Sequence, residues 1–516
     1  MKANWKATAS VLASVSLLVA CVGSASAAQS KPTFTFQVED YGGTLPQANG
    51  PFQQQIERET GVNFHVNWVL YSNYASQLNA EIAAGNLPDV LAIDMQNGQL
   101  FSPEIVQGIQ AGAFKNLTPY IDAPNFAKQY PNLARVSKKV MDMINFDGKI
   151  YALPAYVEPV AGNGTIIIRQ DLWKKAGLPI PTTLNQLATD LITIHKKFGV
   201  YGLDTPNGSI SSSPNYKSLE VAFTGIQDWG VDSKGNFYYQ SFMPQFDQFL
   251  LWMRNLYKAG AIDPEFTLGQ GGSSFKNGDS AASVKEWWGW EQAPKTKKSP
   301  FSPSYLSQNP NARAWGLLPL KGPDGYTVTV EPFQWPIMIS SKVPNSEVPT
   351  ILKFLNFTAS AKYYNQTQLG VKGIDYTIIH GKPVVNPTKM HQTADNYYAV
   401  MFENFPMSAA YLLNQAVQRG VDAKQIAQMK LESRQATKDM NKMHLSEPTW
   451  QVNSPAYDQS WSELTANLDT NEAKVIMNQM TIAQWNQYVQ SITTSKSYKT
   501  ILSQFKSQWL KYYKKH

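Results

Sequence analysis

Three tryptophans stand within four residues in the stretch KEWWGWE, which runs from Lys285 to Glu291. In a strand, alternate side chains share a face, so Trp288 and Trp290 would point one way and Trp287 the other. An indole ring is a large hydrophobic filler, and it is also a rigid plate whose N–H needs a partner when buried. The stretch therefore predicts either three core residues or an aromatic ligand-binding face backed by one core residue.

Hydrolysis is the rival interpretation of the acidic residues near this stretch. Glycoside hydrolysis needs two carboxyl groups flanking one bond, and Glu286, Glu291, Asp40 and Asp94 could nominally supply a pair. With 38 Asp and Glu in the chain, acceptors for the hydroxyls of a polar ligand are the simpler interpretation. The sequence has no G-x-S-x-G elbow, H-E-x-x-H motif or phosphate loop, and its six histidines lack the spacing of metal ligands. We expect no enzyme, no cofactor and no metal.

Composition indicates a folded chain with a neutral polar surface. The 516 residues are 43% hydrophobic and 12% aromatic, which suffices for two or more domains with substantial cores. Only 16% of the residues are charged, which suits a neutral polar ligand. The formal charge of +7 forms no basic stripe apart from the tail Lys511 to His516, so we expect no nucleic-acid partner.

The first 28 residues are expected to be a targeting segment and tether. Lys2 and Lys6 precede an apolar run from Val11 to Ala20, which is too short to span a membrane, so we expect an exported protein. Cys21 is the only cysteine, and Leu18-Val19-Ala20-Cys21 resembles a bacterial lipobox, in which the cysteine carries the lipid. The alternative is cleavage after Ala27, which would leave the protein secreted or periplasmic rather than anchored to the outer face of the membrane by a lipid.

Strands and helices alternate in the first part of the mature chain. The expected elements are a strand from Thr33 to Asp40, a helix over 51–60, a strand over 62–68, a helix over 74–84 and a strand over 89–94. This order is typical of a parallel α/β sheet, whose ligands bind at the carboxyl ends of strands. Asp40, Tyr41 and Asp94 fall at such ends. Later elements are a helix over 245–259 and a strand that ends in the tryptophans, and from Pro349 onward we expect mainly helices.

An ordered set of segments resembles the extracellular solute-binding proteins (family 1 type) of ABC sugar importers, in particular the large oligosaccharide-binding lipoproteins. The chain is more distantly similar to maltodextrin- and alginate-binding receptors. The segments that carry the resemblance are AAGNLPDVLAIDM (83–95), AGAFKNLTPYID (111–122), DGKIYALP (147–154), IIIRQDLWKKAGLPIPTTLNQL (166–187), LYKAGAIDPEF (256–266), FKNGDSAASVKEWWGW (275–290) and VPNSEVPTILKFLNF (343–357).

The resemblance implies an α/β, two-lobed periplasmic-binding-protein fold of type II, with an interlobe hinge and C-terminal helices. It implies an N-terminal lobe of residues 29–158 plus 327–395 and a C-terminal lobe of residues 159–326 plus 396–516. It also implies a receptor, expected to be a monomer, that captures an oligosaccharide between the lobes and delivers it to separate ABC permease subunits in the membrane. A secreted glycan hydrolase and a surface glycan-binding adhesin are the alternatives.

The resemblance also proposes roles for individual residues. Aligned on the small residues before it, Trp288 falls at the position of the sugar-stacking aromatic, where hydroxyls of the sugar would reach acids and amides. The full set of candidate ligand-binding residues is Trp288, Trp290, Trp335, Asp94, Asp40, Tyr41, Glu291, Tyr156, Trp229 and Tyr376. Core packing is the alternative for each aromatic member.

The chain departs from related receptors in two places. Some relatives carry a calcium loop in the region of His195 to Ser209, which here lacks regularly spaced acidic ligands, so we expect no calcium there. The segment VTVEPFQWPIMI, residues 328–339, has no arginine to bind a carboxylate, so we expect a neutral or mixed oligosaccharide rather than a polyuronate.

Overall fold

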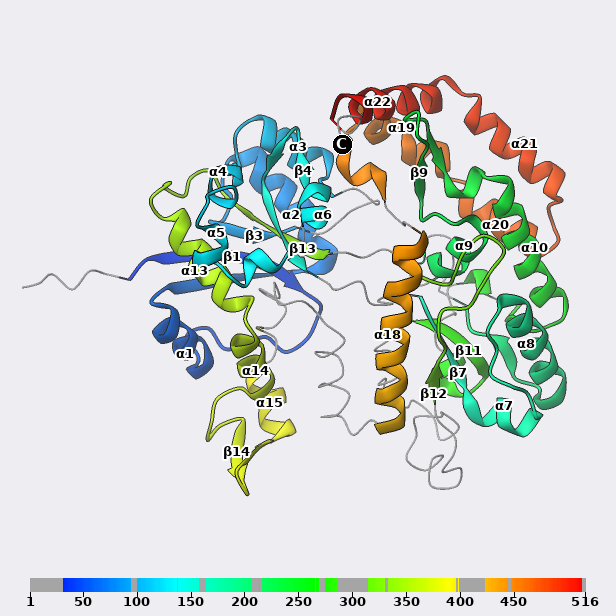
Figure 1. The fold of residues 1–516 in the computed structure, drawn as a ribbon, viewed down its shortest axis with the longest axis horizontal. Helices are drawn as coiled ribbons and strands as arrows, with labels where there is room; N and C mark the ends of the chain where they lie inside the picture. The colour runs from blue at the N-terminus through cyan, green and yellow to red at the C-terminus, as the bar shows by residue number, and fades with distance from the viewer. Residues whose placement is uncertain are drawn as a thin grey trace, which may run out of the picture.

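The structure is a computed structural model that describes residues 31–93, 100–136, 138–156, 164–205, 213, 216–264, 266–268, 274–285, 314–329, 333–395, 398, 423–443 and 447–512. Within these residues the chain builds two α/β bodies, seen at the left and right of Figure 1. Each body has its own sheet and its own hydrophobic core.

The first sheet combines an N-terminal parallel unit with a strand from much later in the chain. Its strand order is β2-β1-β3-β13-β6. The strands are β1 (Thr33–Asp40), β2 (Asn63–Leu70), β3 (Val90–Ala92), β13 (Phe333–Ile339) and β6 (Ala152–Tyr156). β1 runs parallel to β2 and β3, whereas β13 is antiparallel to both β3 and β6. β13 therefore ties the late segment into the first body.

Aromatic side chains bind this sheet to its helices. Phe36 of β1 has its ring centroid 6.1 Å from that of Phe64 on β2 and 5.2 Å from that of Phe354. The helices and short elements of this body are α1 (Pro51–Thr60), α2 (Tyr71–Ala84), α3 (Pro103–Gln110), α4 (Thr118–Ile121), α5 (Phe126–Gln129), η1 (Leu133–Arg135), α6 (Lys138–Met143), β4 (Asn145–Phe146), β5 (Lys149–Ile150), α13 (Val348–Thr358) and α14 (Ala361–Leu369). Because both faces of β1 are covered, even Gln37 and Glu39 are buried.

The second body is built on the sheet β12-β7-β11-β8. Its strands are β7 (Thr165–Arg169), β8 (Tyr201–Leu203), β11 (Ser280–Lys285) and β12 (Ala314–Gly316), and a separate hairpin joins β9 (Trp229–Val231) to β10 (Phe237–Tyr239). Its helices are α7 (Gln170–Ala176), α8 (Leu184–Phe198), α9 (Lys217–Thr224), η2 (Gln240–Phe242), α10 (Pro244–Lys258), η3 (Phe266–Leu268) and α11 (Ser274–Asn277). β11 is parallel to β8 and antiparallel to β7.

Helices from the C-terminal part of the chain pack mainly on the second body (Figure 1). They are α18 (Ala423–Met443), η6 (Pro448–Gln451), α19 (Pro455–Thr465), α20 (Leu468–Ile476), α21 (Ile482–Thr493) and α22 (Lys496–Tyr512). The Arg254 guanidinium of α10 donates to the carbonyls of Val475 (2.6 Å) and Met480 (2.9 Å), which fixes α20 and its exit. None of the helices within the described ranges combines the length and apolar character that a membrane span requires.

The described chain passes between the two cores more than once. Leu317 and Leu320 belong to the second core, and Val328, eight positions after Leu320, belongs to the first. Ala436 of α18 packs in the first core, although Gln428 of the same helix donates to the carbonyl of Gly316 on β12. The C-terminal segment thus contacts both bodies, and the lobe boundaries given above stay predictions.

Most of the early elements were predicted correctly, whereas the hairpin after α14 was not. α1 and β1 have the predicted bounds, and α2, β2, β3 and α10 differ from prediction by a few residues at their ends. The expectation of helices after Pro349 overlooked β14 (Tyr376–Ile379) and β15 (Lys382–Val385). His380 and Gly381 both have positive φ, 51° and 76°, as the two-residue turn of a tight hairpin requires. The run TIIHGKPVV carries that signal in the sequence.

A pair of buried carboxyl groups clamps the base of this hairpin. The carboxylate of Asp375 accepts hydrogen bonds from the Val371 amide (2.7 Å) and the Thr393 hydroxyl (2.7 Å), and it also bonds to the carboxyl of Asp395, just after α15 (Pro387–Thr393). A Cβ on Gly370 would lie 2.5 Å from the Asp375 carboxylate, so only glycine permits this approach. Two carboxyl groups that share a hydrogen bond need one proton between them.

This pair predicts a pH-dependent stability. Burial, the charge of Asp375 and its hydrogen bond raise the pKa of Asp395 from 3.8 to about 7. The folded chain therefore holds a proton that the unfolded chain releases above about pH 4, so the free energy of unfolding should fall as the pH rises from about 4 to about 7. Asp395→Asn should flatten that part of the profile in urea unfolding measured across pH, whereas Asp324→Asn, at an exposed position, should not. Parallel profiles for the parent and Asp395→Asn would contradict the assignment.

Candidate ligand-binding site

Five strand ends meet at one edge of the first sheet. β1 and β2 end side by side at the pair Asp40 and Leu70, and β3 ends at Ala92, opposite Ile337 of β13. β6 ends at Tyr156, which pairs with Phe333, the first residue of β13. The Ile93 amide donates to the carbonyl of Pro336 at 2.8 Å, which holds β3 and β13 together there. Carboxyl ends of parallel strands are the usual ligand-binding edge of an α/β sheet.

Two exposed tyrosines form an aromatic surface at this edge. Tyr41, just after β1, is 47% exposed, and Tyr71, the first residue of α2, is 54% exposed. Their rings stack with centroids 5.5 Å apart and planes at 28°. Leu70, which precedes Tyr71 and pairs with Asp40, also has an exposed side chain. Exposed aromatic rings at the edge where strands end form an apolar surface on which a flat ligand can lie.

Hydrogen bonds from buried groups fix the orientation of this surface. The Asp40 carboxylate accepts from the Gly42 amide at 2.8 Å, in a turn where Gly42 has a φ of 83°. The Tyr41 hydroxyl donates to the carboxylate of Glu39, and Tyr74, one turn after Tyr71, donates to the main chain of β1 and β3. One oxygen of Asp40 therefore accepts the hydrogen bond that closes the turn, Tyr41 is anchored to Glu39, and Tyr71 stacks on Tyr41.

A buried carboxyl group, Asp204, lies at the corresponding edge of the second sheet. β8 is followed by Asp204, and β11 ends at Lys285, which pairs with Thr165 at the start of β7. The Asp204 carboxylate accepts hydrogen bonds from the hydroxyls of Ser274 and Ser283, the latter at 3.2 Å. Burial raises the pKa of Asp204, and the Ser274 bond, the charge of Lys285 and the Ser283 bond oppose that rise.

Buried hydroxyls beside Asp204 add acceptor and donor capacity. The Thr205 side chain is buried, and its hydroxyl has no hydrogen-bond partner among the described residues. A buried unsatisfied hydroxyl costs free energy that a water or ligand group can recover. Neither Asp204 nor Thr205 was foreseen, and neither was Tyr71. The signal available in the sequence was the same as for Asp40, namely a polar or aromatic residue directly after a buried strand.

The two edges are joined by a short crossing of the chain. Residues 157–164 separate Tyr156 at the first edge from Thr165 at the second. The nine Cα to Cα steps of such a crossing span at most about 32 Å when fully extended. The start of β7 therefore lies no farther than that from the end of β6.

Some of the predicted ligand-binding residues lie at the first edge, and others lie outside the described residues. Asp40 and Tyr41 lie at the first edge, and Trp335 on β13 and Tyr156 on β6 lie on neighbouring strands that end there. Asp94 follows Ile93 in sequence but lies outside the described residues. Trp288, Trp290, Glu291 and Cys21 also lie outside them, although Lys285 ends β11 directly before the tryptophans.

Trp229 and Tyr376 lie elsewhere. Trp229 is 2% exposed in a cluster where its ring lies 5.0 Å from Trp461, 5.4 Å from Phe505 and 6.2 Å from Tyr457, so its environment is that of a core residue. Its ligand-binding role is corrected accordingly, because a buried ring offers no face to a sugar. Tyr376 begins β14, on the hairpin that projects at the lower left of Figure 1, and not on the sheet edge.

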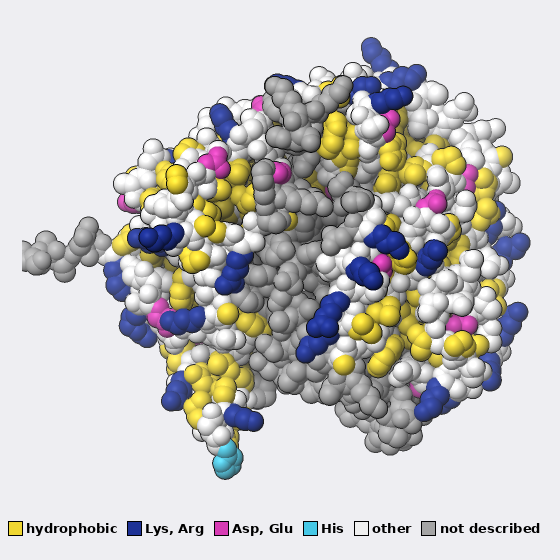
Figure 2. Space-filling view, in the orientation of Figure 1, with side chains coloured by type: hydrophobic (Ala, Val, Ile, Leu, Met, Phe, Trp, Pro, Cys, Tyr) yellow, Lys and Arg dark blue, Asp and Glu magenta, His cyan; other side chains and the backbone are white. Residues whose placement is uncertain are grey.

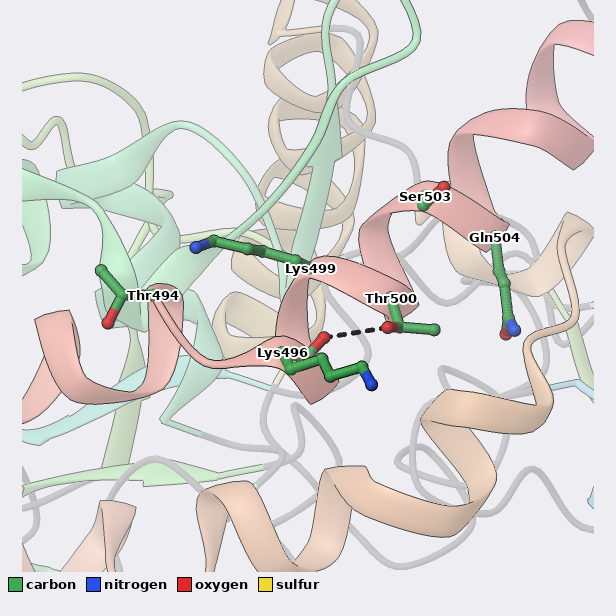
Figure 3. Close-up of a pocket in the computed structure, with 6 residues that line it drawn as sticks. All are labelled: Thr494, Lys496, Lys499, Thr500, Ser503 and Gln504. Atoms are coloured by element: carbon green, nitrogen blue, oxygen red, sulfur yellow. Dashed lines mark hydrogen bonds between the residues drawn. The ribbon is translucent and has the colours of Figure 1, made fainter.

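Two surface hollows lined by described residues lie away from these edges. A hollow of about 570 Å³ runs along one face of α22, lined by Lys496, Lys499, Thr500, Ser503, Gln504 and Thr494 (Figure 3). A smaller one of about 130 Å³ lies beside the outer strand β2, lined in part by Gln53, His65, Trp68 and Tyr398. No group of three or more His, Cys, Asp or Glu side chains within the described ranges is placed to hold a metal ion.

Comparison with known protein families gives one match over most of this architecture. Residues 52–376 match the family described as bacterial extracellular solute-binding protein. The match begins in α1 and ends at β14, so it includes the second sheet and every strand of the first sheet except β1.

Individual proteins show a similar but distant relationship. The lipoprotein LipO of Bacillus subtilis is 24% identical over 377 residues, covering 69% of this chain and 70% of LipO. The polygalacturonan/rhamnogalacturonan-binding protein YtcQ of the same organism is 22% identical over 466 residues, covering 86% of this chain and 84% of YtcQ. The structure of the substrate-binding protein FusA of Streptococcus pneumoniae with kestose superposes with a TM-score of 0.61 at 18% identity, covering 94% of this chain and 99% of FusA. The last likeness establishes the two-lobed fold.

The different environments of Tyr71 and Trp229 predict different effects on stability. Trp229→Ala leaves a cavity in a closed aromatic cluster and should lower the free energy of unfolding by about 3 to 5 kcal/mol. Tyr71→Ala removes an exposed ring and should change it by no more than about 0.5 kcal/mol. Urea unfolding followed by circular dichroism measures both. Equal losses would mean that Tyr71 is part of the core and not of an exposed surface.

Proposed function

The chain belongs to the bacterial extracellular solute-binding proteins, and on that premise we propose that it captures an oligosaccharide between its two sheet edges and passes it to the permease of an ABC importer. The observation that carries this proposal is the exposed, stacked pair Tyr41 and Tyr71 at the carboxyl end of the first sheet. Exposing two large rings side by side costs solvation free energy, and a ligand that covers them recovers it.

The chemistry of the two edges suits a sugar. The apolar face of a pyranose lies on an aromatic ring, and its hydroxyls need acceptors and donors around that ring. Tyr41 and Tyr71 supply the rings on the first edge, and Lys285 at the end of β11 supplies a polar group on the second, where Asp204 and Thr205 are buried. We propose that Trp288 adds a stacking ring directly after β11, and that Trp290, Trp335, Tyr156, Asp94 and Glu291 complete the site.

The names of relatives support a glycan as the ligand class. YtcQ is named for binding polygalacturonan and rhamnogalacturonan, and FusA has been crystallised with kestose. The first is acidic and the second neutral, so these names leave the charge of the ligand open. The absence of arginine from residues 328–339 favours a neutral or mixed oligosaccharide for this chain.

We propose closure of the lobes as the mechanism. A sugar that contacts both edges binds the closed form more tightly than the open form, and so it shifts the population toward closure. The lobes of this proposal are residues 29–158 plus 327–395 and residues 159–326 plus 396–516, which is supported by the pairing of β13 with β3 and β6. The closed monomer would dock on permease subunits at the membrane, where a lipid on Cys21 would hold it.

Glycan retention separates this proposal from the alternatives. The processed chain is incubated with pools of neutral and uronate-containing oligosaccharides, and the bound and free fractions are analysed by mass spectrometry. A receptor should retain an oligosaccharide unchanged, and a ligand at about 100 times its dissociation constant should raise the free energy of unfolding by about 2.7 kcal/mol. Shortened products would instead indicate a hydrolase, and failure to retain any soluble oligomer would favour an adhesin.

The tryptophan stretch gives a sharper test with a matched control. Trp288→Ala should keep most of the melting temperature and lose at least about tenfold in affinity for the retained glycan, which is about 1.4 kcal/mol. Trp287→Ala, on the opposite strand face, should melt earlier and bind nearly normally where folded. The reverse pattern would mean that the two faces are exchanged, and unchanged affinity in both variants would leave the stretch a core element.

A further inference from the structure

We propose that the β14–β15 hairpin is a membrane-contacting element that binds the headgroup region of a bilayer containing anionic phospholipids. The observation behind this proposal is a cluster of exposed aliphatic side chains on a projection whose accessible charges are all positive. The proposal does not depend on the ligand of the cleft, and none of the residues involved lies at the two sheet edges.

The hairpin exposes aliphatic side chains on both of its faces. Ile374, Ile378, Ile379 and Val384 are each between 41% and 49% exposed. Ile378 and Ile379 are neighbours in β14, so they point to opposite faces of the strand, and both are about half exposed. The hairpin therefore stands away from the lobe instead of lying on it. In Figure 2 it is the projection at the lower left, where hydrophobic side chains gather beside lysine side chains.

The charges around these side chains all have one sign. Lys372, Lys382 and Lys389 are exposed on or beside the hairpin. Between Ala361 and Ala394 the sequence has one acidic residue, Asp375, and its side chain is fully buried at the base of the hairpin. Aliphatic groups between lysines match the interface of a bilayer, where acyl chains lie below a layer of anionic phosphates.

The hairpin is held rigidly at its base. Two-stranded hairpins are marginally stable alone in water. Here the buried Asp375 carboxylate binds Val371 and Thr393, and the Asn386 amide donates to the Asp375 carbonyl at 2.7 Å. The hydrogen bonds at the base thus hold a hairpin whose aliphatic side chains are largely exposed. We infer that these side chains contact a partner outside the lobe.

The sequence of the hairpin argues against a second copy of the chain as that partner. Exposed strand edges can pair with another strand, and natural proteins prevent this with proline and lysine on the edge. β15 carries Lys382 and Pro383, and Pro383 lacks the amide hydrogen that a pairing strand needs. A protein partner is also disfavoured by size, because a stable interface takes about 20 to 30 residues from each side, far more than this hairpin offers.

Vesicle sedimentation tests the proposal. The processed chain carrying Cys21→Ser, so that no attached lipid contributes, is mixed with vesicles of phosphatidylcholine alone or of phosphatidylcholine with phosphatidylglycerol, in the absence of sugar. We expect binding to the anionic vesicles that weakens with salt. The pair Lys372→Gln with Lys382→Gln should weaken it by about fivefold for each lysine removed. Ile378→Ser with Ile379→Ser should also weaken it, with the salt dependence retained.

Matched controls come from the second body. Leu251→Ser and Lys258→Gln alter an exposed leucine and an exposed lysine on α10, and they should leave vesicle binding unchanged. Equal binding by the hairpin variants and these controls would overturn the proposal, as would binding that does not require phosphatidylglycerol. Concentration-dependent self-association that is lost in the Ile378 and Ile379 variants would assign the hairpin to a second copy. Binding only to vesicles that contain membrane protein would assign it to a protein partner.

Discussion

The place of β13 between β3 and β6 is the constraint on which the rest of the structure depends. This strand lies more than 170 residues after β6 in sequence, yet it pairs with both β6 and β3 in antiparallel register. To form it, the chain must leave the first body after Tyr156, build the second sheet and return before Phe333. Because the exit after Tyr156 and the return at Phe333 are paired residues at one sheet edge, these two crossings start or end beside the same surface. That surface carries Tyr41 and Tyr71.

The crossing geometry brings the ends of several strands to the edge that we propose as the binding surface. Parallel strands β1, β2 and β3 all end there, so their last side chains have no strand beyond them to pack against. At this edge lies a stacked tyrosine pair, of which Tyr41 donates to Glu39, while Tyr74 in the same helix as Tyr71 donates to the main chain of β1. On the second sheet, the parallel strands β8 and β11 have their carboxyl ends at one edge. The buried carboxyl group of Asp204, which accepts hydrogen bonds from serine hydroxyls, lies directly after β8 at that edge.

Much of this arrangement could be predicted from the sequence, and the failures have physical causes. Apolar periodicity located β1 and α1 correctly because both elements bury one regular face. Asp40 and Tyr41 were placed correctly at the end of a strand because they follow a buried apolar run, and their ligand-binding role stays a prediction. Tyr71 was missed because it opens α2 directly after β2, with no turn residues between them to mark the boundary. Trp229 was misassigned because its burial depends on Tyr457, Trp461 and Phe505, more than 200 residues later, and local pattern holds no information on such packing. The hairpin after Tyr376 was overlooked although its two-residue turn is a local signal.

The central claim is that one ligand contacts both sheet edges and thereby brings the two bodies together. Small-angle X-ray scattering of the processed chain, with and without a saturating concentration of a glycan that it retains, measures this most directly. The account predicts that the radius of gyration falls when the glycan binds, because contacts with both edges exist only in the closed form. Bound glycan with an unchanged radius would contradict it, since the ligand would then be held by one body alone.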